Sequence, residues 1–193
     1  MPTGGPYQLD TVIFKGRIVR KALLPFAIVG FLVVMSRAVT AGDRKDRPPT
    51  SEAINRARKN VRMLDDVYKT TVVLITDKYV NTENDFPAGS AAIELFKQIS
   101  KKGWHDVRLL DATGKPTAST NVAMDDFERD GIKRLQSGQA YYDRVEERGG
   151  KHYLRAITPI PVVMKKCVMC HPHYANAKKG EPIGALSYRI EIE

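Results

Sequence analysis

A short motif near the C-terminus, Cys-Val-Met-Cys-His at residues 167–171, most constrains what this chain can fold into. Two thiols at this spacing can each add to one vinyl group of a haem, and the histidine that follows can ligate the iron through one imidazole nitrogen. Cys167 and Cys170 are the only cysteines in the chain. We therefore predict one covalently attached c-type haem per chain, with Cys167 and Cys170 as anchors and His171 as the proximal iron ligand.

Two other chemistries use cysteines at this spacing. A disulfide or thiol redox pair of Cys167 and Cys170 does not require His171, and no thioredoxin-like alternation of strands and helices surrounds the motif. A zinc site can add His171 and His173 to the two thiols, but zinc motifs separate the cysteine pair from the histidine pair by about a dozen residues. Haem attachment is the interpretation that explains both cysteines and the histidine that follows them.

The N-terminus has the pattern of a secretory signal peptide. Basic residues precede the apolar run at residues 22–35, and small residues follow it, which is typical of a cleaved leader. The run is shorter than the roughly 20 residues that a membrane-spanning helix needs. We expect a signal peptide over residues 1–41, with an uncleaved anchor as the alternative. Both place residues 42–193 outside the cytoplasm, in the periplasm, with a proline-rich linker over 42–51 and a folded domain over 52–193.

Charge and composition narrow the classes of partner. Cleavage of the leader removes five basic residues and Asp10, which lowers the formal net charge from +9 to +5. A mildly basic surface favours acidic protein partners, or association with anionic headgroups at a membrane surface through the N-terminus. No basic stripe is interleaved with aromatic residues as a nucleic-acid groove requires, so we expect no nucleic-acid partner.

The folded domain is expected to begin with a long helix. Ser51 is a suitable N-cap, and apolar residues recur at spacings of three and four from Ile54 to about Tyr79. A second apolar stripe on the same helix consists of Met63, Val67 and Leu74. A helix that is apolar on two sides is sandwiched between two surfaces, here the core and either a haem or a second subunit.

The sequence after the long helix predicts two more helices and an antiparallel sheet. One helix is expected over 90–101, and another runs from a capping box of Asp125 and Glu128 to about Leu135. A Gly149–Gly150 pair suits a hairpin turn. Strands are expected over residues 107–110, 141–146, 151–157 and 185–192. Because helices come first and strands follow, the fold class is α+β, with helices covering one face of the sheet.

The order of these features resembles the PAS-like c-type haem domains, which occur as extracytoplasmic sensor modules of bacterial kinases and chemotaxis receptors and as small free-standing cytochromes. The resemblance covers about residues 52–193. It rests on the long helix, the RLLDATGKP hairpin, the Asn121 loop before DDFE, the LRAITPIPVV strand, and CVMCH before the strand GALSYRIEIE. It implies a haem between the helices and one edge of a five- to six-stranded sheet, and a homodimer built through the N-terminal helices.

The distal iron ligand decides the function, because a strong sixth ligand favours electron transfer and an open site favours gas binding. Some members of the family use a distal cysteine, which is excluded here because both thiols serve in attachment. His173 is too close in sequence to His171 to reach the opposite face of the haem, so we interpret it as a surface or propionate contact. His105 is interpreted as a helix-to-strand junction residue. The remaining candidates are Met63, Met124 and His152, with water or no ligand as alternatives.

We therefore expect a periplasmic monohaem cytochrome that carries one electron between protein partners. The alternative is a haem-based gas or redox sensor that signals in trans, because the chain ends directly after its last strand. We expect no enzyme, because haem-based catalysis such as peroxidase chemistry needs a distal acid–base constellation and none can be assembled from the sequence. The adjacent pairs Asp65–Asp66 and Asp125–Asp126 cannot face each other across a substrate and are interpreted as solvated or capping. Four lysines bracket the motif and are expected to steer an acidic redox partner; they are Lys165, Lys166, Lys178 and Lys179.

Overall fold

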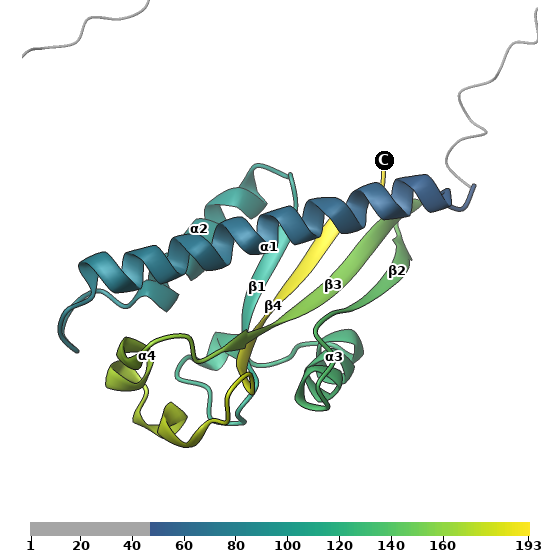
Figure 1. Cartoon of the computed structure of the whole chain (residues 1–193). Coiled ribbons are helices and arrows are strands. Elements are labelled where there is room, and N and C mark those ends of the chain that lie inside the picture. Colours follow the sequence, from purple (N-terminus) through teal and green to yellow (C-terminus); the bar gives the residue numbers. More distant parts are fainter. Residues whose placement is uncertain (1–46) are drawn as a thin grey trace, which may run out of the picture. The chain divides into compact units, whose positions relative to one another are not determined.

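The computed structural model describes residues 47–193 and confirms an α+β fold (Figure 1). The predicted signal peptide over 1–41 and the start of the linker lie outside the described residues. Within residues 47–193, no helix is both long and apolar enough to cross a membrane. The elements in chain order are α1 (Ser51–Tyr79), α2 (Ala88–Lys101), β1 (Asp106–Asp111), the short 3-10 helix η2 (Ser119–Asn121), α3 (Asp126–Gln136), β2 (Tyr142–Arg148), β3 (Lys151–Pro161), α4 (Lys165–Cys170), the 3-10 helix η3 (Pro172–Asn176) and β4 (Pro182–Glu191).

The long helix α1 forms as its apolar spacing predicts. Its N-cap is Thr50 and not Ser51, because the Thr50 hydroxyl accepts a hydrogen bond from the backbone N–H of Ala53 at 3.2 Å. Ser51 is therefore already the first helical residue. The buried side of the helix is formed by Ala53, Ala57, Val61 and Tyr68.

The sheet has the strand order β1-β4-β3-β2, and all neighbours are antiparallel. The family resemblance implies five or six strands, but the sheet of residues 47–193 has four. The Asp111 carboxylate accepts the N–H groups of Thr113, Gly114 and Lys115, which closes the expected turn. The chain then continues along β1 as a loop containing η2, so the turn is not followed by the returning strand of a hairpin.

The hairpin between β2 and β3 forms at the predicted glycine pair. Gly149 and Gly150 have φ values of 62° and 71°, a region that residues with a Cβ atom adopt at a cost. These two φ values are those of a two-residue hairpin turn. The turn joins Arg148 to Lys151, and these two residues pair directly across the two strands.

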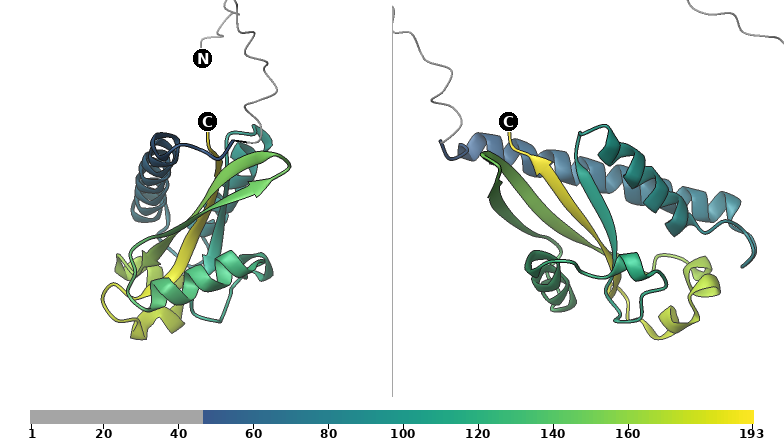
Figure 2. Two further views of the ribbon diagram at one scale, coloured as in Figure 1. Left: turned by 90° about the vertical axis from the view of Figure 1, so that its right-hand side faces the viewer. Right: turned by 180° about the vertical axis from the view of Figure 1, so that it is seen from behind.

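Helices cover both faces of the sheet, which corrects the expectation of one covered face (Figure 2). On one face, Leu186 and Tyr188 of β4 pack with residues of α1 and α2. On the other face, Ala185 packs with Phe127 and Leu135 of α3. The expected half-buried final strand is therefore wrong for its first half, because β4 is a central strand and is buried on both sides from Pro182 to Tyr188.

The second apolar stripe of α1 faces away from the sheet. Met63, Val67 and Leu74 are 58%, 53% and 54% exposed, and no element of residues 47–193 covers them. Within residues 47–193, α1 therefore packs against the core on one side, and the second surface predicted for it is not supplied.

Candidate haem-attachment site

The motif lies in the short helix α4 and the turn that follows it. Cys167 and Cys170 are both in α4, and residues three apart on a helix lie on the same side. Both are free thiols and half-buried. In Figure 1, α4 lies near the C-terminal end of α1, at the end of the sheet from which β3 leaves. This geometry is suited to two thioether bonds to one flat group.

His171 ends α4 and turns its ring toward a distant loop. Its backbone has left the helical region, with φ −131° and ψ 73°. Nδ1 of the ring lies 3.3 Å from the hydroxyl of Thr117, in the loop after β1. The ring also stacks on Tyr174, with centroids 4.8 Å apart. Because Thr117 engages Nδ1, Nε2 is the nitrogen left to ligate an iron.

Burial sets the electrostatics of this cluster. It lowers the pKa of the His171 imidazole, and the nearby His173 lowers it further. Ligation requires the neutral imidazole, which a lowered pKa favours. Burial also raises the pKa of the Tyr174 phenol, with smaller contributions from Asp111 and Cys167. His173 itself is exposed, as its interpretation as a surface residue predicts.

Lys166, one of the four predicted steering lysines, is half-buried and is held against the end of α1, and its steering role stays a prediction. Its ammonium donates to the backbone carbonyls of Asp77 at 2.8 Å and Thr76 at 3.4 Å, in the last turn of α1. It also lies 3.5 Å from Oδ1 of Asn81. The other three lysines around the motif are exposed; they are Lys165, Lys178 and Lys179.

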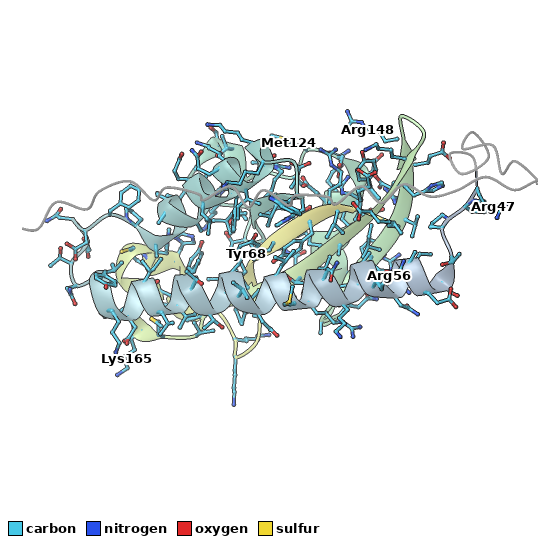
Figure 3. The ribbon with its side chains drawn as sticks, turned by 90° about the horizontal axis from the view of Figure 1, so that it is seen from above. Arg47, Arg56, Tyr68, Met124, Arg148 and Lys165 are labelled. Carbon is cyan, nitrogen blue, oxygen red and sulfur yellow. The ribbon has the colours of Figure 1, made fainter. Side chains whose placement is uncertain are left out.

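The candidate distal ligand His152 lies at the wrong end of β3. It pairs with Glu147 of β2, and its Nε2 is 3.9 Å from the Glu147 carboxylate. Roughly 30 Å of extended strand separates it from Pro161, where β3 ends. Figure 3 shows the same separation: Arg148, in the hairpin, lies toward the N-terminal end of α1, whereas Lys165 lies by its C-terminal end. His152 therefore cannot reach an iron held by His171.

The two methionine candidates are not brought to His171 either. Met63 is exposed, and roughly 20 Å of helix lies between it and Thr76, the part of α1 that Lys166 contacts. Met124 is 66% exposed and lines a cavity of about 720 Å³ beside β1. That cavity is lined by residues of α2, β1, β3, β4, the start of α3 and the loop before it, and by none of the three motif residues.

The acidic pairs differ from their interpretation in one case. Asp65 is not solvated: its carboxylate accepts hydrogen bonds from Thr158 at 2.6 Å and from the buried Tyr188 at 3.0 Å. It thereby joins α1 to the sheet. Asp125 caps α3, as predicted, by accepting from the N–H of Glu128 at 2.9 Å. The capping box is incomplete, because the buried Glu128 carboxylate binds Arg108 and the N–H of Met124.

His105 is a junction residue between α2 and β1, as predicted. Its Nε2 lies 2.8 Å from the hydroxyl of Tyr68 on α1. Burial lowers the pKa of His105, and the neighbouring Asp106 raises it by less. His105 is thus part of the packing between α1 and β1.

Sequence reasoning missed three residues around the motif. Thr117 contacts His171, which lies 54 residues later in the sequence, and Lys166 contacts Asp77, which lies 89 residues earlier. No local pattern signals contacts of this range. Tyr174 stacks on His171, and its place three residues after His171 is the local signal for this contact, because it puts the two rings one turn apart.

The described residues do not assemble the zinc alternative. Within 47–193, no group of three or more His, Cys, Asp or Glu side chains is placed to hold a metal ion. The two thiols, His171 and His173 are therefore not gathered around one point. The donor set fits a c-type haem better, since two thiols on one side of a helix and one imidazole nitrogen are what that group requires.

One family model matches the chain, described as Tll0287-like, over residues 45–189. No curated protein matches. The match covers well over half of the chain and includes α1, the whole sheet core and the Cys-Val-Met-Cys-His motif. The chain belongs to the Tll0287-like family, the extracytoplasmic PAS-like c-type haem domains.

Proposed function

We propose that this protein is a periplasmic monohaem c-type cytochrome that carries one electron. One haem is attached through Cys167 and Cys170, and His171 is the proximal ligand. The observation that carries the proposal is the arrangement of α4: two free, half-buried thiols on one side of a short helix, followed directly by a histidine whose Nδ1 is already engaged by Thr117.

A haem at this site supplies reversible one-electron oxidation and reduction of its iron. The chain's own residues hold the proximal side. Thr117 contacts Nδ1 of His171, which would leave Nε2 to hold the iron, and a hydrogen bond at Nδ1 would tune the basicity of that ligand. Tyr174 restrains the ring by stacking on it. Lys166 restrains α4 through the last turn of α1.

The location follows from the predicted signal peptide, and the kind of partner follows from the charge of the surface. The predicted signal peptide over 1–41, or an uncleaved anchor, delivers the domain to the periplasm. Three exposed lysines beside the motif give this end of the domain a positive rim; they are Lys165, Lys178 and Lys179. An acidic redox partner would therefore be attracted to the end of the domain that carries the motif.

A second candidate function is a haem-based gas or redox sensor that signals in trans. It is favoured because none of the three candidate distal ligands is brought to His171, and an iron without a strong sixth ligand would be able to bind a small ligand. The exposed stripe of Met63, Val67 and Leu74 offers an apolar surface for a homodimer or a signalling partner. Such a contact along α1 is a route for an output signal.

Optical spectra of the purified protein separate the two functions. The haem is first tested for retention during acid–acetone extraction, and spectra are then recorded for the oxidised protein, the dithionite-reduced protein and the reduced protein under CO. A retained haem with a low-spin reduced spectrum that CO leaves unchanged supports the electron carrier. Ready CO binding supports the sensor instead, and a haem that is extracted overturns both.

A further inference from the structure

The last turn of α1 is completed by a side chain from the haem-attachment segment. The final carbonyl groups of any α-helix have no partners within the helix. Here the carbonyls of Thr76 and Asp77 receive the ammonium of Lys166, at 3.4 Å and 2.8 Å. A cation at this position also complements the negative end of the helix dipole.

The turn after α1 is organised around the same point. The Asp85 carboxylate accepts the N–H groups of Asn81 at 2.6 Å and Thr82 at 2.8 Å. Asn81 in turn presents its side-chain oxygen to Lys166 at 3.5 Å. The ammonium thus lies among three acceptors, two of them carbonyls of α1 and one a side chain of the turn.

Helix α4 has few other means of staying in place. It is only six residues long, and no side chain caps its N-terminus. Its residues are half-buried or exposed, and none belongs to the buried core. Lys166 at its start and His171 directly after its end, held by Thr117, are the side chains that tie it to elements distant in sequence.

We propose that Lys166 couples haem attachment at Cys167 to the folding of the last turn of α1. The inference rests on the proposed haem site. Two thioether bonds fix the backbone of α4, and Lys166 directly precedes Cys167. A fixed backbone lowers the entropy lost when the ammonium stays on the helix carbonyls, so the last turn of α1 opens less often. The same contact would also restrain α4 while the two thiols react, which favours attachment.

The chain contains a matched control. Lys165 is the neighbouring residue and carries the same charge, but it is exposed and makes no hydrogen bond or ion pair within residues 47–193. Lys165→Met and Lys166→Met therefore remove the same charge from adjacent positions. Only the second removes the contact with α1, and Lys166→Arg keeps a cation of similar reach at that position.

The test is hydrogen–deuterium exchange of segment 76–83 in the full chain, with and without attached haem. In wild type and in Lys165→Met, we expect attached haem to slow exchange of this segment at least tenfold. In Lys166→Met we expect less than a twofold effect and a lower yield of haem-loaded protein, and Lys166→Arg is expected to recover part of the protection. If the haem-free chain does not fold, the haem-loaded forms alone decide, because segment 76–83 should still exchange fastest in Lys166→Met.

Two results overturn the coupling. One is haem-dependent protection of segment 76–83 that is as large in Lys166→Met as in wild type. The other is an equal loss of protection in Lys165→Met, which would assign the effect to charge alone. Acid–acetone extraction of the same samples separates the causes. If the haem is extracted, both the attachment site and the coupling are refuted. If the haem is covalent but segment 76–83 is protected as well in Lys166→Met as in wild type, only the coupling is refuted.

Discussion

The hydroxyl of Thr117 lies 3.3 Å from Nδ1 of His171, although 54 residues separate them in the chain. This contact joins the loop after β1 to the residue that ends α4. It places a hydrogen-bond partner on the imidazole nitrogen that faces away from the expected iron, and such partners fix the ring and raise the basicity of a metal ligand. The loop is thus part of the candidate haem site.

Thr117→Val should raise the reduction potential of the haem. A less basic imidazole stabilises the ferric iron less, and one hydrogen bond corresponds to a shift of about 20–60 mV if it acts mainly on one oxidation state. The haem should remain covalently attached. Potentiometric titration of the holoprotein measures the shift. Thr120→Val, in the same loop, is the control and should leave the potential unchanged; equal potentials in Thr117→Val and wild type would contradict this role.

Asp65→Ala should destabilise the protein by about 2–4 kcal/mol, because it leaves the buried hydroxyls of Tyr188 and Thr158 without their acceptor. Burial and the Asp65 carboxylate both raise the pKa of Tyr188, so its hydroxyl stays a donor at all ordinary pH values. Urea unfolding of the holoprotein gives the free energy. Asp66→Ala, at the exposed neighbouring position, should change it by less than about 0.5 kcal/mol. Similar losses for both variants would refute the buried role of Asp65.

His105 should make the protein less stable as the pH falls. Its pKa is lowered in the folded state, mainly by burial, so the unfolded chain binds the proton more readily. The stabilisation is complete above the unfolded pKa of about 6.5 and is lost as the pH falls toward the lower folded value. Once both ring nitrogens are protonated, Nε2 can no longer accept a hydrogen bond from the Tyr68 hydroxyl, 2.8 Å away. Urea unfolding at pH 7.5 and pH 5.5 should show a smaller difference in His105→Gln than in wild type or His152→Gln; an unchanged difference counts against the assignment.

Local patterns accounted for most of the elements. The apolar spacing of α1, the Asp125 cap of α3 and the Gly149–Gly150 turn are each decided by residues that are close in sequence, so they could be predicted. The Cys-Val-Met-Cys-His motif was also recognised from residue order, whereas haem attachment through it stays a prediction.

The errors concern residues that meet across the fold. Helix α3 can pack closely on its face of the sheet because its own residue Gly131 has no side chain: a Cβ atom there would lie 2.6 Å from Ile157 of β3. The missing return strand depends on Arg108, whose guanidinium donates to the carbonyls of Thr120 and Val122 and holds that segment as a loop. Such choices depend on tertiary contacts that periodicity does not record.

The intact mass of the purified chain under denaturing conditions tests the central claim most directly. Covalent attachment through Cys167 and Cys170 predicts a wild-type chain heavier by one haem. Each single variant, Cys167→Ala or Cys170→Ala, should retain at most one thioether bond, and the double variant should lose the added mass. Absence of haem mass from the wild-type chain, or its retention in the double variant, would contradict the account.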